Sequence, residues 1–346
     1  MIKAFLLVAV VLDPPVLGRM ARRLTPEPRV FQFEVDGVPV EMLRPPDDEP
    51  RPAWIFVNGA HPLRRREPVV WRLAQGLARA GYVVFVPDIP GLGDGTVTAR
   101  TLDATGAVTA AACGRRDVRA GRVALVGAST GAGLALIAAG RPDLAERVSI
   151  VAAVAPFADL RKLICLTTTG YYEENGEFAR YEVTDLHRQV VARSLVAAIP
   201  TQPERDRLLA ALDEIERSEL DPLDELPHRA HDSSPEARAV LEVLANRDPK
   251  RFGGLFDALP PSVHAFIGEL SPLRFREGLR ARIEICVPPS DVYFPPGEAA
   301  ALAALPNARL TVTRTLDHTR PSLSLAHLRS FARFSGFVVR GLRAAG

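Results

Sequence analysis

Residues 122–133 read Arg-Val-Ala-Leu-Val-Gly-Ala-Ser-Thr-Gly-Ala-Gly and carry the strongest fold signal in the sequence. The apolar run 122–126 predicts a buried strand, and the small-residue run 131–139 predicts a helix. Between them, Ser129 is flanked by Gly127 and Gly131 in a G-x-S-x-G pattern. Glycine is needed at both positions because the turn is tight, and such a turn projects the serine hydroxyl above a sheet. The sequence therefore predicts that Ser129 is a nucleophile and that the helix N-terminus supplies N–H groups for an anion.

On both sides of this stretch, short apolar strands alternate with helical segments. Strands are predicted over 30–35, 38–43, 53–57, 82–86, 148–154, 283–287 and 309–314, and helices over 68–80, 101–113, 296–304 and 323–343. Asp36-Gly37 predicts a hairpin turn between the first two strands. Continuously apolar strands separated by helices indicate an α/β fold with a mostly parallel sheet that helices cover on both faces.

The alternation stops between residues 160 and 277, where the chain is charged and helix-forming. We expect this helical block to be inserted into one core made of residues 29–159 and 278–346, with residues 1–28 as a separate apolar segment. The block contains four of the seven histidines, at 187, 228, 231 and 264, which we interpret as solvated loop residues and not as a metal site. The stretches 171–174 and 252–256 contain aromatic residues, and either substrate binding or packing within the block would explain why these residues are there.

An acid and a base follow the last two predicted strands. Asp291 comes after the strand at 283–287, and His318 comes after the strand at 309–314. Parallel strands end at the same edge of a sheet, so Ser129, Asp291 and His318 can meet there in the chain order Ser, Asp, His. Two other carboxylates compete for the role of the acid: Asp159 follows the strand at 148–154, and Asp317 adjoins the histidine.

These motifs resemble those of the α/β-hydrolase superfamily, in particular its serine esterases and lipases that carry a helical cap. The resemblance covers about residues 29–160 and 278–346. It implies a Ser129–His318–Asp291 catalytic triad, an oxyanion hole from the backbone N–H groups of Ala60 and Thr130, and a cap formed by the block. The N–H of His61 is an alternative to that of Ala60, because the loop 58–61 departs from the family's His-Gly pattern at Asn58.

The resemblance implies hydrolysis of a carboxylic ester or related acyl substrate, without a metal or organic cofactor. Two other classes stay open: a hydrolase-like binding or scaffold protein without turnover, and a dinucleotide-dependent oxidoreductase. The second rests on Gly127, Gly131 and Gly133, which match a dinucleotide-binding glycine pattern. It is disfavoured because at least two strand–helix units precede these glycines and no Tyr-x-x-x-Lys pair occurs.

Composition bounds the partners and the location. The 346 residues carry a net charge of +2, which does not favour nucleic-acid binding, and three widely spaced cysteines disfavour a disulfide framework or a zinc site. Forty arginines against three lysines are typical of a GC-rich bacterial genome. We expect a cytoplasmic protein with a small-molecule substrate. The apolar run 4–12 leaves weak membrane association through residues 4–20, or secretion through residues 1–18, as alternatives.

Overall fold

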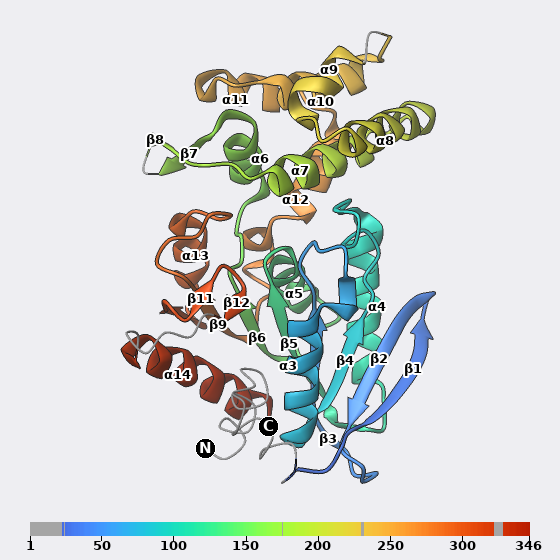
Figure 1. Cartoon of the computed structure of the whole chain (residues 1–346), viewed down its shortest axis with the longest axis vertical. Helices are drawn as coiled ribbons and strands as arrows, with labels where there is room; N and C mark the ends of the chain where they lie inside the picture. Colours follow the sequence, from blue (N-terminus) through green and yellow to red (C-terminus); the bar gives the residue numbers. More distant parts are fainter. Residues whose placement is uncertain (1–22, 24, 175, 230–231, 322–327) are drawn as a thin grey trace.

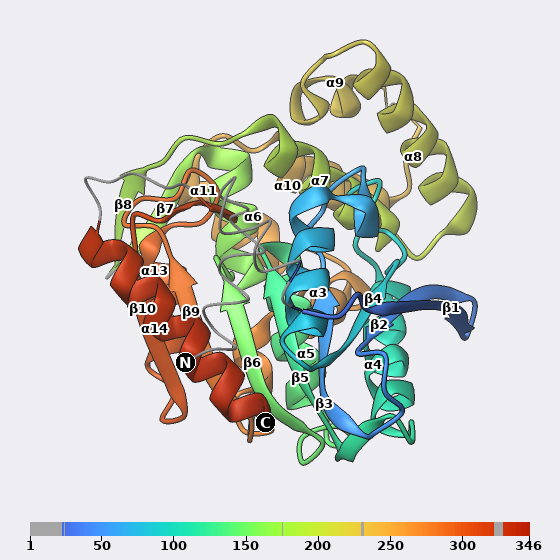
Figure 2. The same ribbon diagram turned by 60° about the horizontal axis from the view of Figure 1, so that its bottom comes forward.

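The computed structural model describes residues 23, 25–174, 176–229, 232–321 and 328–346. Its centre is an eight-stranded sheet in the order β1-β2-β4-β3-β5-β6-β9-β10 (Figures 1 and 2). The antiparallel pairs are β1–β2 and β2–β4, and every other neighbouring pair is parallel. The strands are β1 (Arg29–Val35), β2 (Val38–Arg44), β3 (Arg51–Val57), β4 (Val83–Pro87), β5 (Val118–Ala128), β6 (Val148–Val154), β9 (Arg282–Val287) and β10 (Ala308–Val312).

Helices cover both faces of this sheet because successive side chains of each buried strand point to opposite sides. On β3, Trp54 and Phe56 pack in one apolar cluster with α3 (Pro68–Arg79) and α14 (Leu328–Ala345). Ile55 points the other way, into a cluster that contains α4 (Ala99–Cys113), α5 (Thr130–Gly140) and α13 (Pro296–Ala303). The predicted α/β architecture with a mostly parallel sheet is therefore confirmed.

The helical block lies over the end of the sheet at which β3, β5, β6 and β9 finish (Figure 1). It contains α6 (Leu160–Thr169), α7 (Asp185–Ala197), α8 (Gln202–Arg217), α9 (Pro222–His228), α10 (Pro235–Ala245), α11 (Pro249–Asp257), α12 (Pro261–Glu269) and η2 (Pro272–Phe275). A short hairpin, β7 (Tyr171–Glu174) with β8 (Glu177–Arg180), was not predicted. Its mostly exposed strands lack the apolar pattern by which the sheet strands were predicted.

Two predicted segments fall outside the described residues. One is the apolar segment before residue 23, and the other is 322–327, so that the described part of the last helix begins at Leu328. Within the described ranges, no helix combines the length and the apolarity that a bilayer crossing requires.

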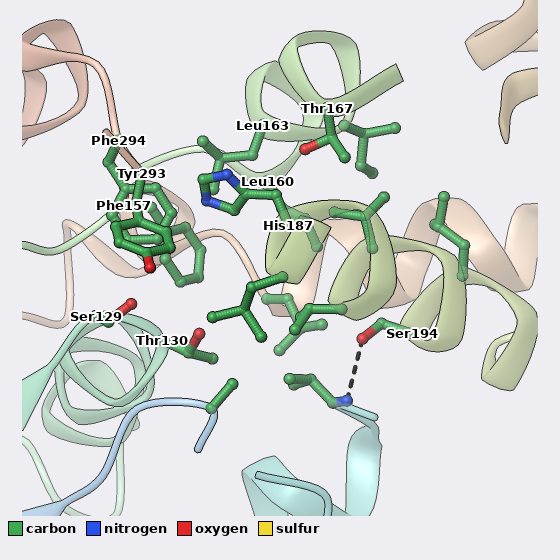
Figure 3. Close-up of a pocket in the computed structure, with 18 of the residues that line it drawn as sticks. Ser129, Thr130, Phe157, Leu160, Leu163, Thr167, His187, Ser194, Tyr293 and Phe294 are labelled. Carbon is green, nitrogen blue, oxygen red and sulfur yellow. Dashed lines mark hydrogen bonds between the residues drawn. The ribbon is translucent and has the colours of Figure 1, made fainter. Parts of the chain in front are cut away.

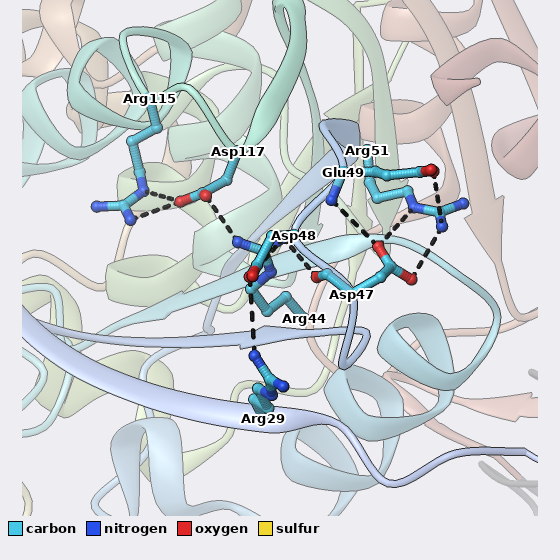
Figure 4. A network of polar contacts seen from close by, with 8 residues as sticks. All are labelled: Arg29, Arg44, Asp47, Asp48, Glu49, Arg51, Arg115 and Asp117. Carbon is cyan, nitrogen blue, oxygen red and sulfur yellow. Dashed lines mark hydrogen bonds and ion pairs between the residues drawn. The ribbon is translucent and has the colours of Figure 1, made fainter.

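A buried ion network joins three segments at the other end of the sheet (Figure 4). Asp117 accepts hydrogen bonds from Arg44 at 2.7 Å and from Arg115 at 2.6 Å. Arg44 also donates to the carbonyl of Asp47 at 2.6 Å, and the Arg51 N–H donates to the carbonyl of Asp117 at 2.9 Å. The network thus ties the end of β2 and the start of β3 to the start of β5.

We expect Asp117→Ala to lower the free energy of unfolding by about 3–5 kcal/mol, because it leaves the buried Arg44 guanidinium with only the exposed Asp48 as a carboxylate partner, at 3.7 Å. A matched control is Asp143→Ala. Asp143 pairs with Arg141 at the same spacing as Asp117 with Arg115, but its side chain is 55% exposed against 11% for Asp117. The control should cost less than about 1 kcal/mol. Equal losses of unfolding free energy in the two variants, measured by urea unfolding, would contradict a stabilising role for the buried Asp117 network.

A second buried carboxylate links the core to the helical block. Glu298 on α13 accepts hydrogen bonds from the N–H groups of Ala158 at 2.6 Å and Asp159 at 2.9 Å, just before α6 begins. Its other oxygen accepts from the Tyr172 hydroxyl at 2.8 Å. Burial is the largest influence on this carboxyl and raises its pKa above the ordinary 4.5.

Because the folded-state pKa of Glu298 is raised, the folded protein holds this proton more tightly than the unfolded chain. The stability that the group contributes is full below its ordinary pKa and is lost as the pH rises through the folded pKa. Glu298→Gln keeps an acceptor for the two N–H groups and removes the titration. The unfolding free energy of this variant relative to the natural protein, measured by urea unfolding, should therefore increase from pH 4 to pH 8.

Candidate active site

Ser129 lies in the sharp turn between β5 and α5. Its backbone has φ 54° and ψ −125°, a strained conformation for a residue other than glycine. The Ser129 N–H donates to the Val154 carbonyl at 2.9 Å, which anchors the turn to the neighbouring strand β6. The strained turn directs the side chain away from the sheet, toward the space below the helical block.

The two flanking glycines are required because backbone atoms occupy the places that side chains would take. A Cβ at position 127 would lie 2.4 Å from the Gly131 carbonyl oxygen. A Cβ at position 131 would lie 2.1 Å from the carbonyl oxygen of Val57 and 2.2 Å from that of Asn58. The prediction that steric contact imposes both glycines is confirmed, and the contact also fixes the loop after β3 against the serine turn.

The loop after β3 brings Ala60 to the serine. A Cβ at Gly59 would lie 3.2 Å from the Cβ of Ser129, and Ala60 lines the same cavities as Ser129. Thr130, the other predicted oxyanion residue, is the first residue of α5. The alternative donor, the His61 N–H, donates to the Leu92 carbonyl at 2.9 Å, and this bond disfavours it as an oxyanion donor.

The predicted acid and base are in contact. Nδ1 of His318 lies 2.9 Å and 2.8 Å from the two carboxylate oxygens of Asp291. The Tyr293 N–H donates to Asp291 at 2.8 Å, so the loop after β9 fixes the carboxylate itself. Both side chains are largely buried, Asp291 at 5% exposure and His318 at 12%. His318 has φ 49°, so the base, like the serine, occupies a strained backbone conformation.

The competing carboxylates have other environments. Asp159 caps α6, and its side chain accepts from the Arg161 N–H at 2.9 Å. Asp317 is exposed. Of the three carboxylates weighed from the sequence, Asp291 is the one that the structure places on the imidazole.

Ser129 and His318 share an outer cleft of about 320 Å³, which nine residues between positions 56 and 70 also line together with Val292 and Tyr293. No hydrogen bond joins Ser129 Oγ to His318 among the described residues. Hydrogen bonds between a nucleophile and its base are often loose in a free enzyme and tighten around the substrate. The Tyr293 ring packs against His318 at a tilt of 37°, with 4.3 Å between ring centroids, and limits how the imidazole can turn.

A second, inner cavity of about 70 Å³ opens beside Ser129 and Thr130 (Figure 3). Its walls are almost entirely apolar and come from α6, α7 and α12 of the block and from the loops after β6 and β9. The aromatic stretches predicted at 171–174 and 252–256 are not among the lining residues. Tyr172 instead binds Glu298, and Phe252 packs on Phe256 with 5.6 Å between ring centroids. The structure therefore favours packing over substrate binding as the role of these two stretches.

Sequence reasoning missed His187, which it treated as a solvated loop residue. His187 lies in the first turn of α7 and lines the inner cavity, and both of its ring nitrogens are buried. Burial, and then the nearby positive charge of His318 when protonated, lower the pKa of His187 to about 4. The sequence signal available was the Thr184 side chain, which caps α7 by accepting from the His187 N–H and so places this histidine in a helix.

Comparison with known proteins supports the fold. Residues 67–195 match the family model described as the alpha/beta hydrolase fold. An acylaminoacyl peptidase in complex with a peptidyl chloromethyl ketone is similar at a TM-score of 0.51 and 12% identity, over 92% of this chain and 41% of that one. Dipeptidyl peptidase 4 of Porphyromonas gingivalis is similar at 0.50 and 14% identity, over 95% of this chain and 37% of that one. Esterase Est1E of Butyrivibrio proteoclasticus has a TM-score of 0.49 and 12% identity, over 91% and 99%.

No curated protein matches this sequence. The chain spans less than half the length of the two peptidases, and at these identities the likeness concerns the fold alone. The chain has the α/β-hydrolase fold, and the resemblance to that superfamily predicted from Gly127–Gly131, Asp291 and His318 is confirmed.

The close backbone contacts around the serine turn leave no room for a methyl group at Gly131. Gly131→Ala should destabilise the protein by several kcal/mol, because the new Cβ meets backbone carbonyls that cannot move independently. The control is Gly254→Ala, an exposed mid-helix glycine of α11 with open space around its Cβ position, which should stabilise the protein by about 0.5–1 kcal/mol. Thermal unfolding of both variants is the measurement, and a tolerated Gly131→Ala would contradict the argument.

Proposed function

We propose that this protein is a serine hydrolase that cleaves a carboxylic ester or related acyl substrate through an acyl-enzyme intermediate. The observation that carries the proposal is the contact between Asp291 and His318 in the cleft that Ser129 lines. A carboxylate on Nδ1 holds the imidazole in the tautomer whose Nε2 is free to take a proton. A histidine oriented in this way, beside a serine in a strained strand–helix turn, is the arrangement that activates a hydroxyl.

In the proposed reaction, Nε2 of His318 takes the Ser129 hydroxyl proton as Oγ attacks the substrate carbonyl. The oxyanion of the tetrahedral intermediate accepts hydrogen bonds from the N–H groups of Ala60 and Thr130, and the N-terminus of α5 adds its positive end. Asp291 stabilises the imidazolium. The imidazolium then protonates the leaving-group oxygen, the carbon–oxygen bond breaks, and an acyl-Ser129 ester remains. His318 next deprotonates a water, which attacks this ester and restores the serine.

The helical block acts as a cap in this proposal. It closes the inner cavity with apolar side chains, which exclude water and strengthen electrostatic interactions around the reacting carbonyl. Leu186 of α7 and Val292 of the loop after β9 are exposed apolar residues that line the outer cleft. An uncharged ester with an apolar part suits these surroundings better than a charged substrate does.

The test is covalent labelling with a fluorophosphonate, followed by peptide mass spectrometry. We expect the adduct on Ser129 and no labelling of Ser129→Ala or His318→Ala. Asp291→Asn should lower kcat for short aryl esters by about 10⁴-fold because the imidazole tautomer is no longer fixed. Asp159→Asn is the control, since asparagine also caps a helix, and it should keep full activity. An unlabelled Ser129 in folded protein would favour the binding or scaffold alternative.

A further inference from the structure

His187 is a buried polar side chain whose hydrogen-bonding groups are unused. Neither ring nitrogen makes a hydrogen bond among the described residues, and neither is accessible to solvent. Its ring projects from α7 toward Tyr293 and Phe294, above Ser129 and Thr130 (Figure 3), with ring centroids 5.4 Å and 5.5 Å apart. Buried polar groups in native proteins are nearly always paired, with protein, ordered water or a ligand, so an orphaned imidazole on a cavity wall offers two hydrogen-bonding positions to a group that enters the cavity.

The charge state of His187 defines that partner. With its pKa near 4, the imidazole is neutral at ordinary pH, so one nitrogen donates a hydrogen bond and the other accepts one. The other side chains around it are mainly apolar, and the nearby Asp291 is the carboxylate of the proposed triad. A charged ligand group would be left without a counter-charge. An uncharged oxygen, a hydroxyl or a ketone, matches what the imidazole offers.

The positions of the two cavities indicate that this oxygen belongs to the acyl half of the substrate. His318 lines the outer cleft and not the inner cavity, and the histidine must reach the leaving-group oxygen, so the leaving group occupies the outer cleft. The acyl chain then enters the inner cavity between Thr130 and His187. A cavity of about 70 Å³ has room for about five water-sized groups, which corresponds to a short acyl chain.

We propose that His187 is a specificity-determining residue that binds a hydroxyl or keto oxygen on a short acyl chain. The substrate class is then short hydroxy- or oxo-acyl esters. This inference rests on the proposed serine hydrolase and narrows its substrate. Thr167 of α6, which also lines the cavity and whose hydroxyl points into it in Figure 3, supplies a second polar group on the same side.

The experiment compares kcat/KM for the 4-nitrophenyl esters of butanoate and 3-hydroxybutanoate, which differ by one hydroxyl. The natural protein should prefer the hydroxylated ester by at least about 10-fold, since the unsubstituted chain leaves His187 unpaired. His187→Phe keeps the ring shape and removes both nitrogens, and it should reverse the preference. His187→Gln restores a donor and an acceptor and should recover part of it. His264→Phe, a histidine of α12 that does not line the cavity, should leave the ratio unchanged.

Three results would overturn the inference: no preference for the hydroxylated ester in the natural protein, the same ratio in the natural protein and His187→Phe, or hydrolysis of neither ester by protein that the fluorophosphonate labels. Labelling at Ser129 separates this failure from that of the proposed function. A labelled natural protein with no preference for the hydroxylated ester rejects His187 alone, whereas absence of labelling rejects the hydrolase. The thermal unfolding midpoint of His187→Phe checks that the variant is folded, and a structural role alone would not change the ratio between two substrates.

Discussion

The structure depends on a contact between backbone atoms, where the start of α5 meets the loop after β3. Because Gly131 has no side chain, the carbonyls of Val57 and Asn58 approach the helix closely, and that approach places Ala60 beside Ser129. The nucleophile, one predicted oxyanion donor and the helix N-terminus are therefore positioned by packing at the edge of the central sheet. This rigidity offsets the strain of the positive φ at Ser129, because β5, which leads into the turn, is paired with β3 on one side and β6 on the other.

The remaining groups reach the serine from longer loops and are arranged by aromatic packing. Asp291 and His318 follow β9 and β10, and Tyr293 lies between the rings of His318 and His187. Tyr293 and its neighbour Phe294 thus each contact both His318 in the core and the orphaned histidine of the helical block. The base is also held by its carboxylate, whereas the orphaned histidine has no hydrogen-bond partner among the described residues. This difference in hydrogen bonding fits the two proposed roles: proton transfer for His318 and ligand binding for His187.

Much of the core could be predicted from the sequence because its signals are local. The strand–turn–helix around Ser129 and the apolar strands that precede Asp291 and His318 each rest on a few adjacent residues. The acid was ambiguous because Asp159 and Asp291 each follow a strand, and the contact that distinguishes them, between Asp291 and His318, joins residues 27 positions apart in the chain. The role of His187 could not be predicted, because its burial is created by the loop after β9, about a hundred residues away in the chain.

The local signals belong to the residues of the proposed reaction, and the distant ones belong to the residues that would select the substrate. The reaction steps proposed for the core need groups at fixed positions, and adjacent residues in a strand–turn–helix fix positions well. Discrimination between substrates needs a partly closed surface that fits one shape and offers hydrogen bonds to one pattern, and only elements from distant parts of the chain can enclose it. The helical block supplies that enclosure with an apolar wall and one neutral imidazole. A ligand without a matching oxygen leaves the buried imidazole of His187 without a hydrogen bond and therefore binds less tightly. Burial of this unpaired imidazole thus favours a substrate that carries the oxygen.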